Sequence, residues 1–254
     1  MNSSRVQFYD RYHKKNNNTF KIINRNNITY WFIIRLIEQS VPNLNQKLIL
    51  DIGCGVGTIG FFLVKQGAVV LGLDVSKRAI ELAKHTQIAN QFESIKFAQI
   101  DISDADDSNA SFKRLSSKFD LIICTEVLEH VTEDKRLLIE CRKLLKSSGV
   151  IVITTQSSEG LLAKNGFFKK HDDAVGHLRR YKPDALIKLI ESSGLMVIKI
   201  QNADGLLRSV LYTTKLGFLL KFIRGPLIPI FQWLDLQTIK IFGAADIQIV
   251  AKRS

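Results

Sequence analysis

The sequence predicts an α/β protein built on a doubly wound sheet. Short apolar runs alternate with helix-compatible segments along most of the chain, and this alternation is typical of strands covered on both faces by helices. The first apolar run, 47–52, ends in closely spaced glycines, and Asp74 and Asp101 end the next two runs. Because ligands of such sheets bind beyond the carboxyl ends of the strands, these residues mark the predicted functional edge.

Each element is predicted from a local pattern. A helix begins at Thr58 and ends at Gly67, and Ser76 caps the next helix, as expected from the preference for small polar residues at helix starts and glycine after helix ends. Thr132 is expected to cap a further helix that runs to Lys146. The predicted strands are 47–52, 68–73, 95–100, 119–124, 149–155, 195–200 and 247–252, and the last has the alternating pattern of an edge strand.

The chain is expected to form one domain. Its 254 residues suit a single α/β domain, which buries about three quarters of its unfolded surface and needs neither disulfides nor a structural metal. The expected parts are a helical N-terminal cap (1–46), a sheet core (47–204), an apolar and basic helical insertion (205–243) and a final strand (244–254).

Composition and charge narrow the setting in which the protein works. A formal net charge of +12 attracts nucleic acid, anionic lipid or anionic small molecules, or serves solubility alone. Three separated cysteines without metal-ligand spacing favour a reducing intracellular compartment. The N-terminus is polar, and no run of about 20 uncharged apolar residues occurs. We therefore expect a cytoplasmic protein, either free or peripheral at the inner membrane surface.

A glycine-rich turn follows the first strand. Gly53, Gly55 and Gly57 allow the backbone to approach a ligand closely, and the next helix points its N–H groups toward that ligand. The stretch from Gly55 to Gly60 also satisfies the dinucleotide-binding pattern, and a tight turn without a ligand is a further alternative. Asp51 directly before the turn disfavours the dinucleotide alternative, because a dinucleotide-binding strand is usually apolar up to its first glycine and a carboxylate repels pyrophosphate.

Acidic residues end the second and third strands. Asp74 is placed to accept hydrogen bonds from both hydroxyls of a ribose, and the alternative is a helix-capping role beside Ser76. Asp101 is placed to accept a hydrogen bond from an adenine amino group while Ile102 covers the ring, and the alternative is a solvated loop carboxylate.

These motifs resemble, in order and spacing, those of class I S-adenosylmethionine-dependent methyltransferases. They are Leu48–Gly57, Gly72–Ser76, Asp101, Thr125–His130 and Leu144–Gly149. The resemblance covers residues 47–200 and implies a Rossmann-like sheet of seven strands with the last strand antiparallel. It implies S-adenosylmethionine as the methyl donor, held by Asp51, Gly53, Cys54, Gly55, Gly57, Asp74, Val75, Asp101, Ile102, Thr125 and Glu126.

Methyl transfer requires alignment of donor and acceptor, and a hydroxyl acceptor also needs a base. His130 and His177 are the candidate catalytic residues, and His171 lies in the same loop as His177. Related methyltransferases of small molecules and glycans carry a stretch similar to the Gly-His-Leu-Arg-Arg-Tyr of residues 176–181. The alternative for each histidine is a packing or surface role.

Glu126, Glu129 and His130 form an E-x-x-E-H cluster. A similar cluster binds a divalent ion in ubiquinone-pathway O-methyltransferases and small-RNA 3′-end methyltransferases, and these ligand types suit Mg²⁺ or Mn²⁺. Because the same string also occurs in relatives without a known metal, we assign no metal ligands from the sequence and leave a divalent ion as an open alternative.

The acceptor is predicted by elimination. Motifs for methylating base amines or pyrimidine rings are missing from the sequence, which favours a hydroxyl or carboxyl of a small-molecule, lipid-linked or glycan-linked acceptor. The alternatives are an RNA methyltransferase, which the net charge of +12 and the E-x-x-E-H cluster suggest, and a noncatalytic binding protein. Residues 206–234 are expected either to cover the site as a helical lid or to lie on a membrane as an amphipathic element.

Overall fold

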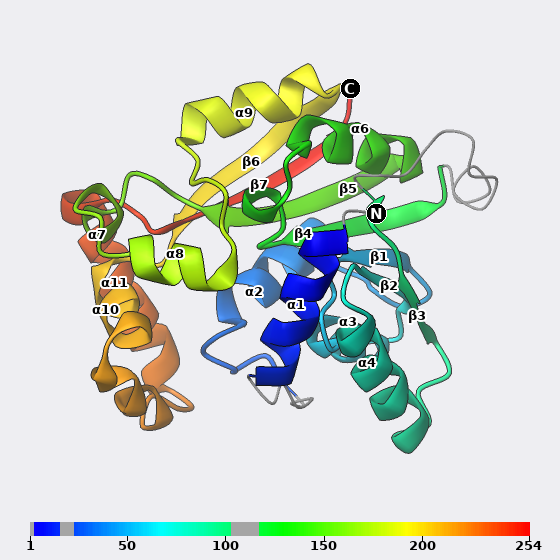
Figure 1. Cartoon of the computed structure of the whole chain (residues 1–254), viewed down its shortest axis with the longest axis horizontal. Coiled ribbons are helices and arrows are strands. Elements are labelled where there is room, and N and C mark those ends of the chain that lie inside the picture. Colours follow the sequence, from blue (N-terminus) through cyan, green and yellow to red (C-terminus); the bar gives the residue numbers. More distant parts are fainter. Residues whose placement is uncertain (1–2, 16–22, 103–116) are drawn as a thin grey trace.

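A single seven-stranded sheet forms the centre of the computed structural model, which describes residues 3–15, 23–102 and 117–254 (Figure 1). Residues 16–22 of the expected N-terminal cap lie outside the described residues. The strand order is β3-β2-β1-β4-β5-β7-β6. The strands are β1 (Leu48–Ile52), β2 (Val69–Asp74), β3 (Ile95–Gln99), β4 (Phe119–Thr125), β5 (Leu145–Gln156), β6 (Leu195–Ala203) and β7 (Asp246–Arg253).

The last strand runs against its neighbours. β7 pairs antiparallel with both β5 and β6, whereas β1 to β5 form parallel pairs. The predicted antiparallel last strand is therefore confirmed. The prediction that 247–252 is an edge strand is wrong, because β7 lies inside the sheet and its residues from Asp246 to Ala251 are buried. The alternation of apolar and polar residues along a strand does not show which other strands pair with it.

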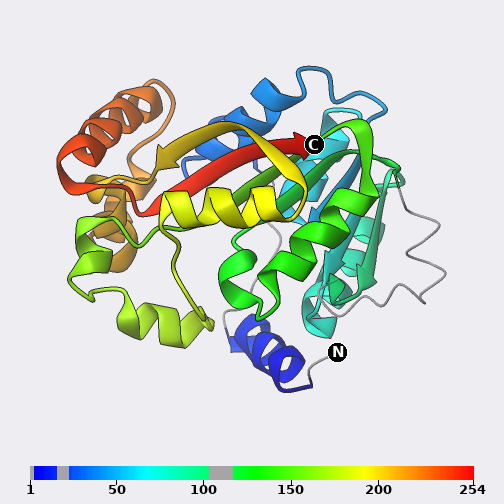
Figure 2. The same ribbon diagram turned by 90° about the horizontal axis from the view of Figure 1, so that it is seen from above.

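Helices cover both faces of the sheet (Figures 1 and 2). The helices α2 (Trp31–Ser40), α3 (Thr58–Lys65) and α4 (Lys77–Ala89) pack on one face, and α6 (Asp134–Leu144) and α9 (Pro183–Ser192) pack on the other. Neighbouring residues of β1 point to opposite faces: Ile49 belongs to the hydrophobic core under α2, α3 and α4, and Leu50 belongs to the core under α6 and α9. Strands buried on both faces explain the continuous apolar runs in the sequence.

The first residues of α4 and α6 show whether Ser76 and Thr132 cap these helices as predicted. Ser76 caps α4 as predicted, since its Oγ accepts the N–H of Ala79 at 3.1 Å. Thr132 does not cap α6: the helix begins at Asp134, Glu133 precedes it without a side-chain cap, and it ends at Leu144 rather than at Lys146. The chain passes directly from α6 into β5, so the pairing of β5 with β4 replaces the last predicted turn of helix.

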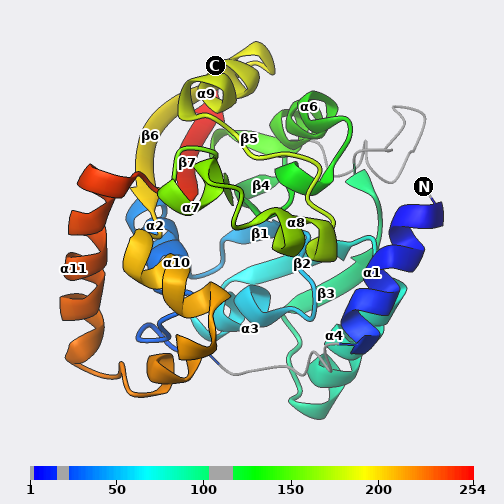
Figure 3. The ribbon, with the colours of Figure 1, turned by 60° about the vertical axis from the view of Figure 1, so that its left-hand side comes forward.

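The remaining helices border the carboxyl edge of the parallel strands. α1 (Ser3–Lys15) packs against α4, while α7 (Leu161–Lys164) and α8 (Lys169–Val175) follow β5. α10 (Leu206–Thr213), the 3-10 helix η3 (Lys215–Lys221) and α11 (Leu227–Phe242) form the insertion before β7, at one end of the molecule (Figure 3). Among the described residues, no helix is long and apolar enough to cross a membrane.

Candidate functional site

A cavity of about 180 Å³ lies at the carboxyl ends of β1, β2, β3 and β4. This is the edge that the sequence predicts for the site. The parallel strands bring together residues that are far apart in the chain, and α1 closes the cavity on one side. The lining consists of Tyr9, Tyr12, His13, Ile52, Gly53, Gly55, Leu73, Asp74, Val75, Ile100, Asp101, Ile102, Glu126, Val127, His130, Val131 and Leu137.

The glycine-rich turn uses its glycines for two purposes. All three have positive φ, at 70° for Gly53, 53° for Gly55 and 83° for Gly57. Gly53 and Gly55 line the cavity. A Cβ at Gly53 would lie 2.5 Å from Cγ2 of Val127, whereas one at Gly55 would meet His13 only at 3.9 Å, which leaves the backbone of Gly55 open to a ligand. Gly57 does not line it, and a Cβ there would lie 2.6 Å from Cζ of Phe97. Gly57 therefore serves the turn into α3.

Asp74 links the turn to the start of α4. One carboxylate oxygen accepts the N–H of Gly55 and the other accepts the N–H of Ser76, each at 2.8 Å. The residue is only 9% exposed and lines the cavity. Each carboxylate oxygen has more than one lone-pair site, so both can also accept a ligand hydroxyl. The helix-capping and ligand-binding roles proposed for Asp74 are thus compatible.

The end of β3 supplies the far wall of the cavity. Asp101 and Ile102 are buried and line it together with Val75 and Ile100. The backbone N–H of Ile100 donates to the carbonyl oxygen of Asp74 at 3.0 Å, which joins this wall to the end of β2. An apolar slot with one carboxylate suits a flat heterocycle that carries an amino group.

Asp51 and Cys54 lie behind the cavity wall rather than in it. Asp51 is 2% exposed, and burial, followed by the charge of Asp74, raises its pKa to about 7. The sulfur of Cys54 lies beside Gly72, where an added Cβ would be 2.9 Å away. The predicted roles of Asp51 and Cys54 at the methyl donor stay predictions.

Replacing Asp51 with Asn is expected to change how stability depends on pH. Because the folded-state pKa of Asp51 is near 7 instead of 3.8, its protonated form stabilises the fold below pH 4, and this contribution is lost as pH rises toward 7. The upper limit of the loss is about 4 kcal/mol. Thermal melts from pH 4 to 8 should fall less with pH in Asp51→Asn than in the wild type; parallel curves would exclude a raised pKa.

Helix α1 closes the cavity with side chains that the sequence did not identify. Tyr9, Tyr12 and His13 line the cavity. Asp10 anchors the helix, because its Oδ1 accepts Ser76 Oγ at 2.6 Å and the N–H of Arg78 at 3.0 Å. The only local signal is the spacing of the aromatic residues on one side of the helix, and such spacing is equally typical of core packing.

A second cavity of about 420 Å³ lies next to the first, and Glu126 lines both. It is bordered by the ends of β4 and β5, by the start of β7 and by α10. Thr125, expected at the methyl donor, opens into this second cavity instead of the first. The lining consists of Thr29, Tyr30, Phe32, Ile33, Ile59, Thr125, Glu126, Thr154, Gln156, Phe168, His171, Arg180, Asp204, Arg208, Ser209, Tyr212, Thr213, Ala245, Asp246 and Gln248.

Glu126 is held rigidly between the two cavities. Its φ of 53° is unusual for a residue with a side chain and costs about 1–3 kcal/mol unless the surroundings enforce it. Those surroundings are on β5: Thr154 Oγ1 and Gln156 Nε2 donate to its carboxylate at 2.8 and 2.5 Å, and its own N–H donates to the carbonyl of Thr154. Backbone strain at a cavity junction is typical of a functional residue.

Two further carboxylates line the second cavity. Burial raises the pKa of Asp204 to about 6 although Arg208 opposes the shift. Burial and the charge of Glu126 raise the pKa of Asp246 well above its usual value. Asp246 Oδ1 is buried and has no hydrogen-bond partner within the described part of the chain. This cavity therefore offers carboxyl groups whose oxygens accept hydrogen bonds and whose protonated forms also donate one.

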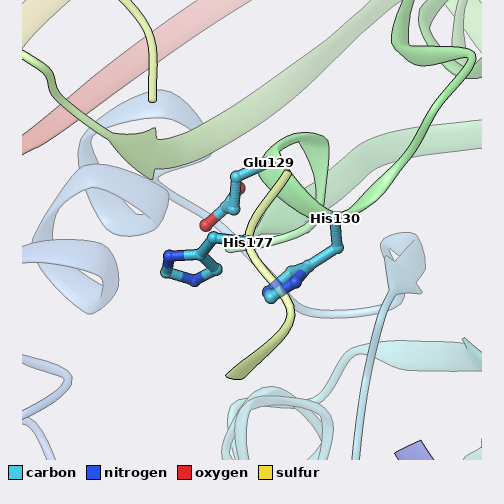
Figure 4. A group of neighbouring side chains, drawn as sticks. All are labelled: Glu129, His130 and His177. Carbon is cyan, nitrogen blue, oxygen red and sulfur yellow. The ribbon is translucent and has the colours of Figure 1, made fainter. Parts of the chain in front are cut away.

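Glu129, His130 and His177 point toward one another beside these cavities (Figure 4). Glu129 and His130 belong to the 3-10 helix η2 (Leu128–His130), and His177 follows α8. One potential ligand atom from each residue lies within 4.8 Å of the others. His130 lines the first cavity, and the ring of His171, 6.0 Å from that of His177, lines the second.

Each member of this three-residue cluster is oriented by a neighbour. Glu129 is fully buried; its Oε2 accepts Thr155 Oγ1 at 2.7 Å, and its Oε1 has no partner among the described residues. Nδ1 of His130 donates to the carbonyl of Gly176 at 3.1 Å. Nδ1 of His177 contacts Asp172 at 2.8 Å. Such second contacts are typical of metal-binding histidines, because they fix the ring orientation and leave Nε2 as the coordinating atom.

Asp172 joins the cluster to the second cavity. Its two oxygens accept Nη2 and Nε of Arg180 at 2.6 and 2.8 Å in a bidentate pair. Arg180 stacks on Phe168 and also contacts Gln156, so the loop after α8 is fixed to β5. The loop that carries His177 and the Gly-His-Leu-Arg-Arg-Tyr stretch is therefore packed against the site.

Comparison with known proteins identifies the family to which this chain belongs. Residues 44–192, more than half of the chain, match the family model of the methyltransferase domain. The chain belongs to the methyltransferase family. Its sequence is 34% identical over 139 residues to the ubiquinone biosynthesis O-methyltransferase of Histophilus somni, a match that covers 55% of this chain and 56% of that protein. The chain thus matches about half of the length of this curated relative.

Solved structures show the same fold. The methyltransferase superposes on the S-adenosylmethionine-dependent methyltransferase of Archaeoglobus fulgidus with a TM-score of 0.60 and 19% identity, over 96% of this chain and 99% of the other. A Haemonchus contortus phosphoethanolamine N-methyltransferase in complex with S-adenosylmethionine gives 0.64 and 18%, over 87% and 51%. Only the second of these two names gives an acceptor, and a likeness at this level of identity shows the fold alone.

The first cavity lies where the sequence motifs predict the methyl donor, S-adenosylmethionine. The residues of the predicted set that line this cavity are Gly53, Gly55, Asp74, Val75, Asp101, Ile102, Glu126 and His130. Asp51, Cys54 and Gly57 lie behind its wall, Thr125 lines the second cavity, and His177 joins His130 and Glu129. The individual contacts of these residues with the donor stay predictions.

Proposed function

We propose that this methyltransferase moves the methyl group of S-adenosylmethionine, bound in the first cavity, to a hydroxyl oxygen of a small acceptor in the second. Glu126, which lines both cavities, carries this proposal. In the reaction the acceptor oxygen attacks the methyl carbon in line, the carbon–sulfur bond breaks, and S-adenosylhomocysteine leaves. The rigid walls align the two reactants, and the acceptor loses its hydroxyl proton to a base.

Two observations support an oxygen acceptor. The similar proteins from Histophilus and Coxiella are named O-methyltransferases. In addition, Glu126, Asp204 and Asp246 offer carboxylate oxygens in the second cavity, and these accept hydrogen bonds from a hydroxylated molecule. Asp246 Oδ1, which is buried without a partner among the described residues, gains one when such an acceptor binds.

A divalent cation is part of this proposal. The sequence left such an ion open, and His177 now completes a set with Glu129 and His130. The set fits a metal because Glu129 Oε1 is buried without a partner in the described structure and each imidazole is oriented through Nδ1. A cation bound there would lower the pKa of a coordinated hydroxyl. Glu126 then accepts the proton of the hydroxyl, and His130 and His177 act as ligands instead of bases.

The acceptor class is tested with purified protein and S-adenosylmethionine labelled in its methyl group. The acceptor panel contains catechols, simple sugars and lipid-linked phenols, together with amine analogues of each and a short RNA. We expect label on oxygen of a hydroxylated compound, located by mass spectrometry. Transfer only to amines or to RNA would overturn the proposal, and donor binding by calorimetry without any transfer would indicate a noncatalytic protein.

The metal site is tested by adding Mn²⁺ to EDTA-treated protein and following bound ion by electron paramagnetic resonance. We expect one bound ion, at least about tenfold weaker binding in Glu129→Gln and His177→Ala, and loss of methyl transfer after EDTA with recovery on adding Mg²⁺ or Mn²⁺. His85→Ala, a substitution of an exposed histidine on α4, serves as the matched control. Equal Mn²⁺ binding in all variants, or transfer indifferent to EDTA, would remove the metal.

A further inference from the structure

The insertion of residues 205–243 exposes an unusual amount of apolar surface. More than half of the large apolar side chains that are exposed in the described structure lie in this small part of the chain. Within the insertion, the most exposed apolar side chains are Ile241 at 76%, Phe222 at 70% and Trp233 at 61%. Single exposed apolar residues are normal on a soluble protein, whereas a contiguous group of them marks an interaction surface.

Poor packing of the insertion does not explain this exposure. Asp235 is fully buried, and its carboxylate accepts the N–H groups of Gly205 and Arg208, at 2.8 and 2.9 Å. Arg208 is also buried and donates to the carbonyl of Ile28. α10 packs against both η3 and α11, and the three elements form one unit (Figure 3). One side of this unit is thus anchored to the protein while the other presents apolar side chains outward.

The charges on this surface are all positive. Lys215, Lys221, Arg224 and Lys240 are exposed among the apolar side chains. The only acidic residue between 205 and 243 is Asp235, which is buried. Aromatic and aliphatic side chains interleaved with lysine and arginine are typical of elements that lie in the membrane interface, where the apolar groups enter the acyl region and the cations meet lipid phosphates.

We propose that the outward face of α10, η3 and α11 binds the surface of a membrane that contains anionic lipids. No described helix can span the bilayer, so the element lies on it. A second copy of the chain is a poorer occupant, because a symmetric contact through this face brings two sets of exposed cations into one interface without a compensating acid.

Membrane binding through this face also places the second cavity near the bilayer. Arg208, Ser209, Tyr212 and Thr213 of α10 line that cavity, and the same helix carries part of the apolar surface. If the proposed function holds, an acceptor embedded in the membrane or linked to lipid reaches the cavity along α10. The binding surface itself does not depend on that function.

The test measures flotation of the full-length protein with vesicles of phosphatidylcholine alone or mixed with phosphatidylglycerol. We expect at least about tenfold stronger binding to the mixed vesicles at low salt and weaker binding at high salt. The double variant Phe222→Ser/Trp233→Ser should lose that binding at least about tenfold while keeping the melting temperature, because both side chains are mainly exposed. Ile88→Ser, at an equally exposed apolar residue on α4, is the matched control and should bind as the wild type does.

Three outcomes would overturn the proposal. These are no flotation of the wild type, equal loss in Ile88→Ser, and a concentration-dependent dimer in light scattering that Phe222→Ser/Trp233→Ser abolishes without any vesicle binding by the wild type. Affinity of the double variant for S-adenosylhomocysteine and its transfer to a water-soluble acceptor should stay within about twofold of wild type, so failure of the surface and failure of the proposed function are distinguishable.

Discussion

Replacing Asp74 with Asn is expected to weaken the binding of S-adenosylhomocysteine by about 100-fold or more. The carboxylate accepts the N–H groups of Gly55 and Ser76, and the proposed ribose contacts add two hydrogen bonds to a charged acceptor, worth about 1.5–3 kcal/mol each. An amide keeps one acceptor oxygen but turns an NH₂ group toward one of the two backbone N–H donors. The variant therefore loses both the ligand contacts and the shape of the glycine-rich turn.

Isothermal titration calorimetry with S-adenosylhomocysteine measures this loss, and Glu81→Gln provides the comparison. Glu81 is an exposed carboxylate on α4 whose contacts with Lys77 and Arg78 are long, at 4.0 and 3.9 Å. Surface pairs of this kind contribute about 0–1 kcal/mol, so its affinity should equal that of the wild type. An Asp74→Asn protein that binds within about threefold of wild type would show that Asp74 serves only to cap α4.

Replacing Glu126 with Gln is expected to lower kcat by about 100- to 10,000-fold while the affinity for S-adenosylmethionine changes little. The substitution keeps the size of the side chain and removes the base. It also places an amide NH₂ opposite Thr154 Oγ1 or Gln156 Nε2, both of which donate to Glu126. The hydroxyl of Thr154 can rotate to accept, so we expect the fold to survive.

Single-turnover transfer to the best hydroxylated acceptor of the panel, measured together with donor affinity, separates the two effects. Glu133→Gln, at an exposed residue seven positions along the chain, should leave both quantities unchanged. A fall in donor affinity equal to the fall in rate would assign Glu126 to donor binding alone. Unchanged kcat in Glu126→Gln would exclude it as the proton acceptor.

The position of the first cavity was largely predictable from the sequence. Gly53, Asp74 and Asp101 follow three successive strands, and parallel strands bring their carboxyl ends to one edge. The spacing along the chain is therefore enough to place these residues together. The pattern of apolar and polar residues predicted the position of a strand in the sheet less reliably. β7 has the alternation of an edge strand, yet its antiparallel pairing with β5 and β6 buries it inside the sheet.

The second cavity was much less predictable. Asp204 and Asp246 reach the second cavity because β7 returns between β5 and β6 and brings both to the end of β5. His177 lies beside Glu129 because the loop after α8 is held by the pair of Asp172 and Arg180 and by the N–H of Leu178, which donates to the carbonyl of Glu129 at 2.7 Å. Neither juxtaposition is encoded in a short spacing. Tyr9 and Tyr12 were also not predicted as lining residues of the first cavity. They reach it because α1 packs against α4, which lies far from α1 along the chain.

The sequence by itself determined the fold class, the edge of the sheet at which the first cavity lies and the apolar, basic character of the insertion. These follow from periodicity, from glycines at strand ends and from composition, which are local properties of the chain. The tertiary structure decided which residues share a cavity, why Glu126 adopts a strained backbone and which face of the insertion is exposed. These three features depend on contacts between segments that are far apart in sequence. Such contacts form only when the chain folds and brings the segments together.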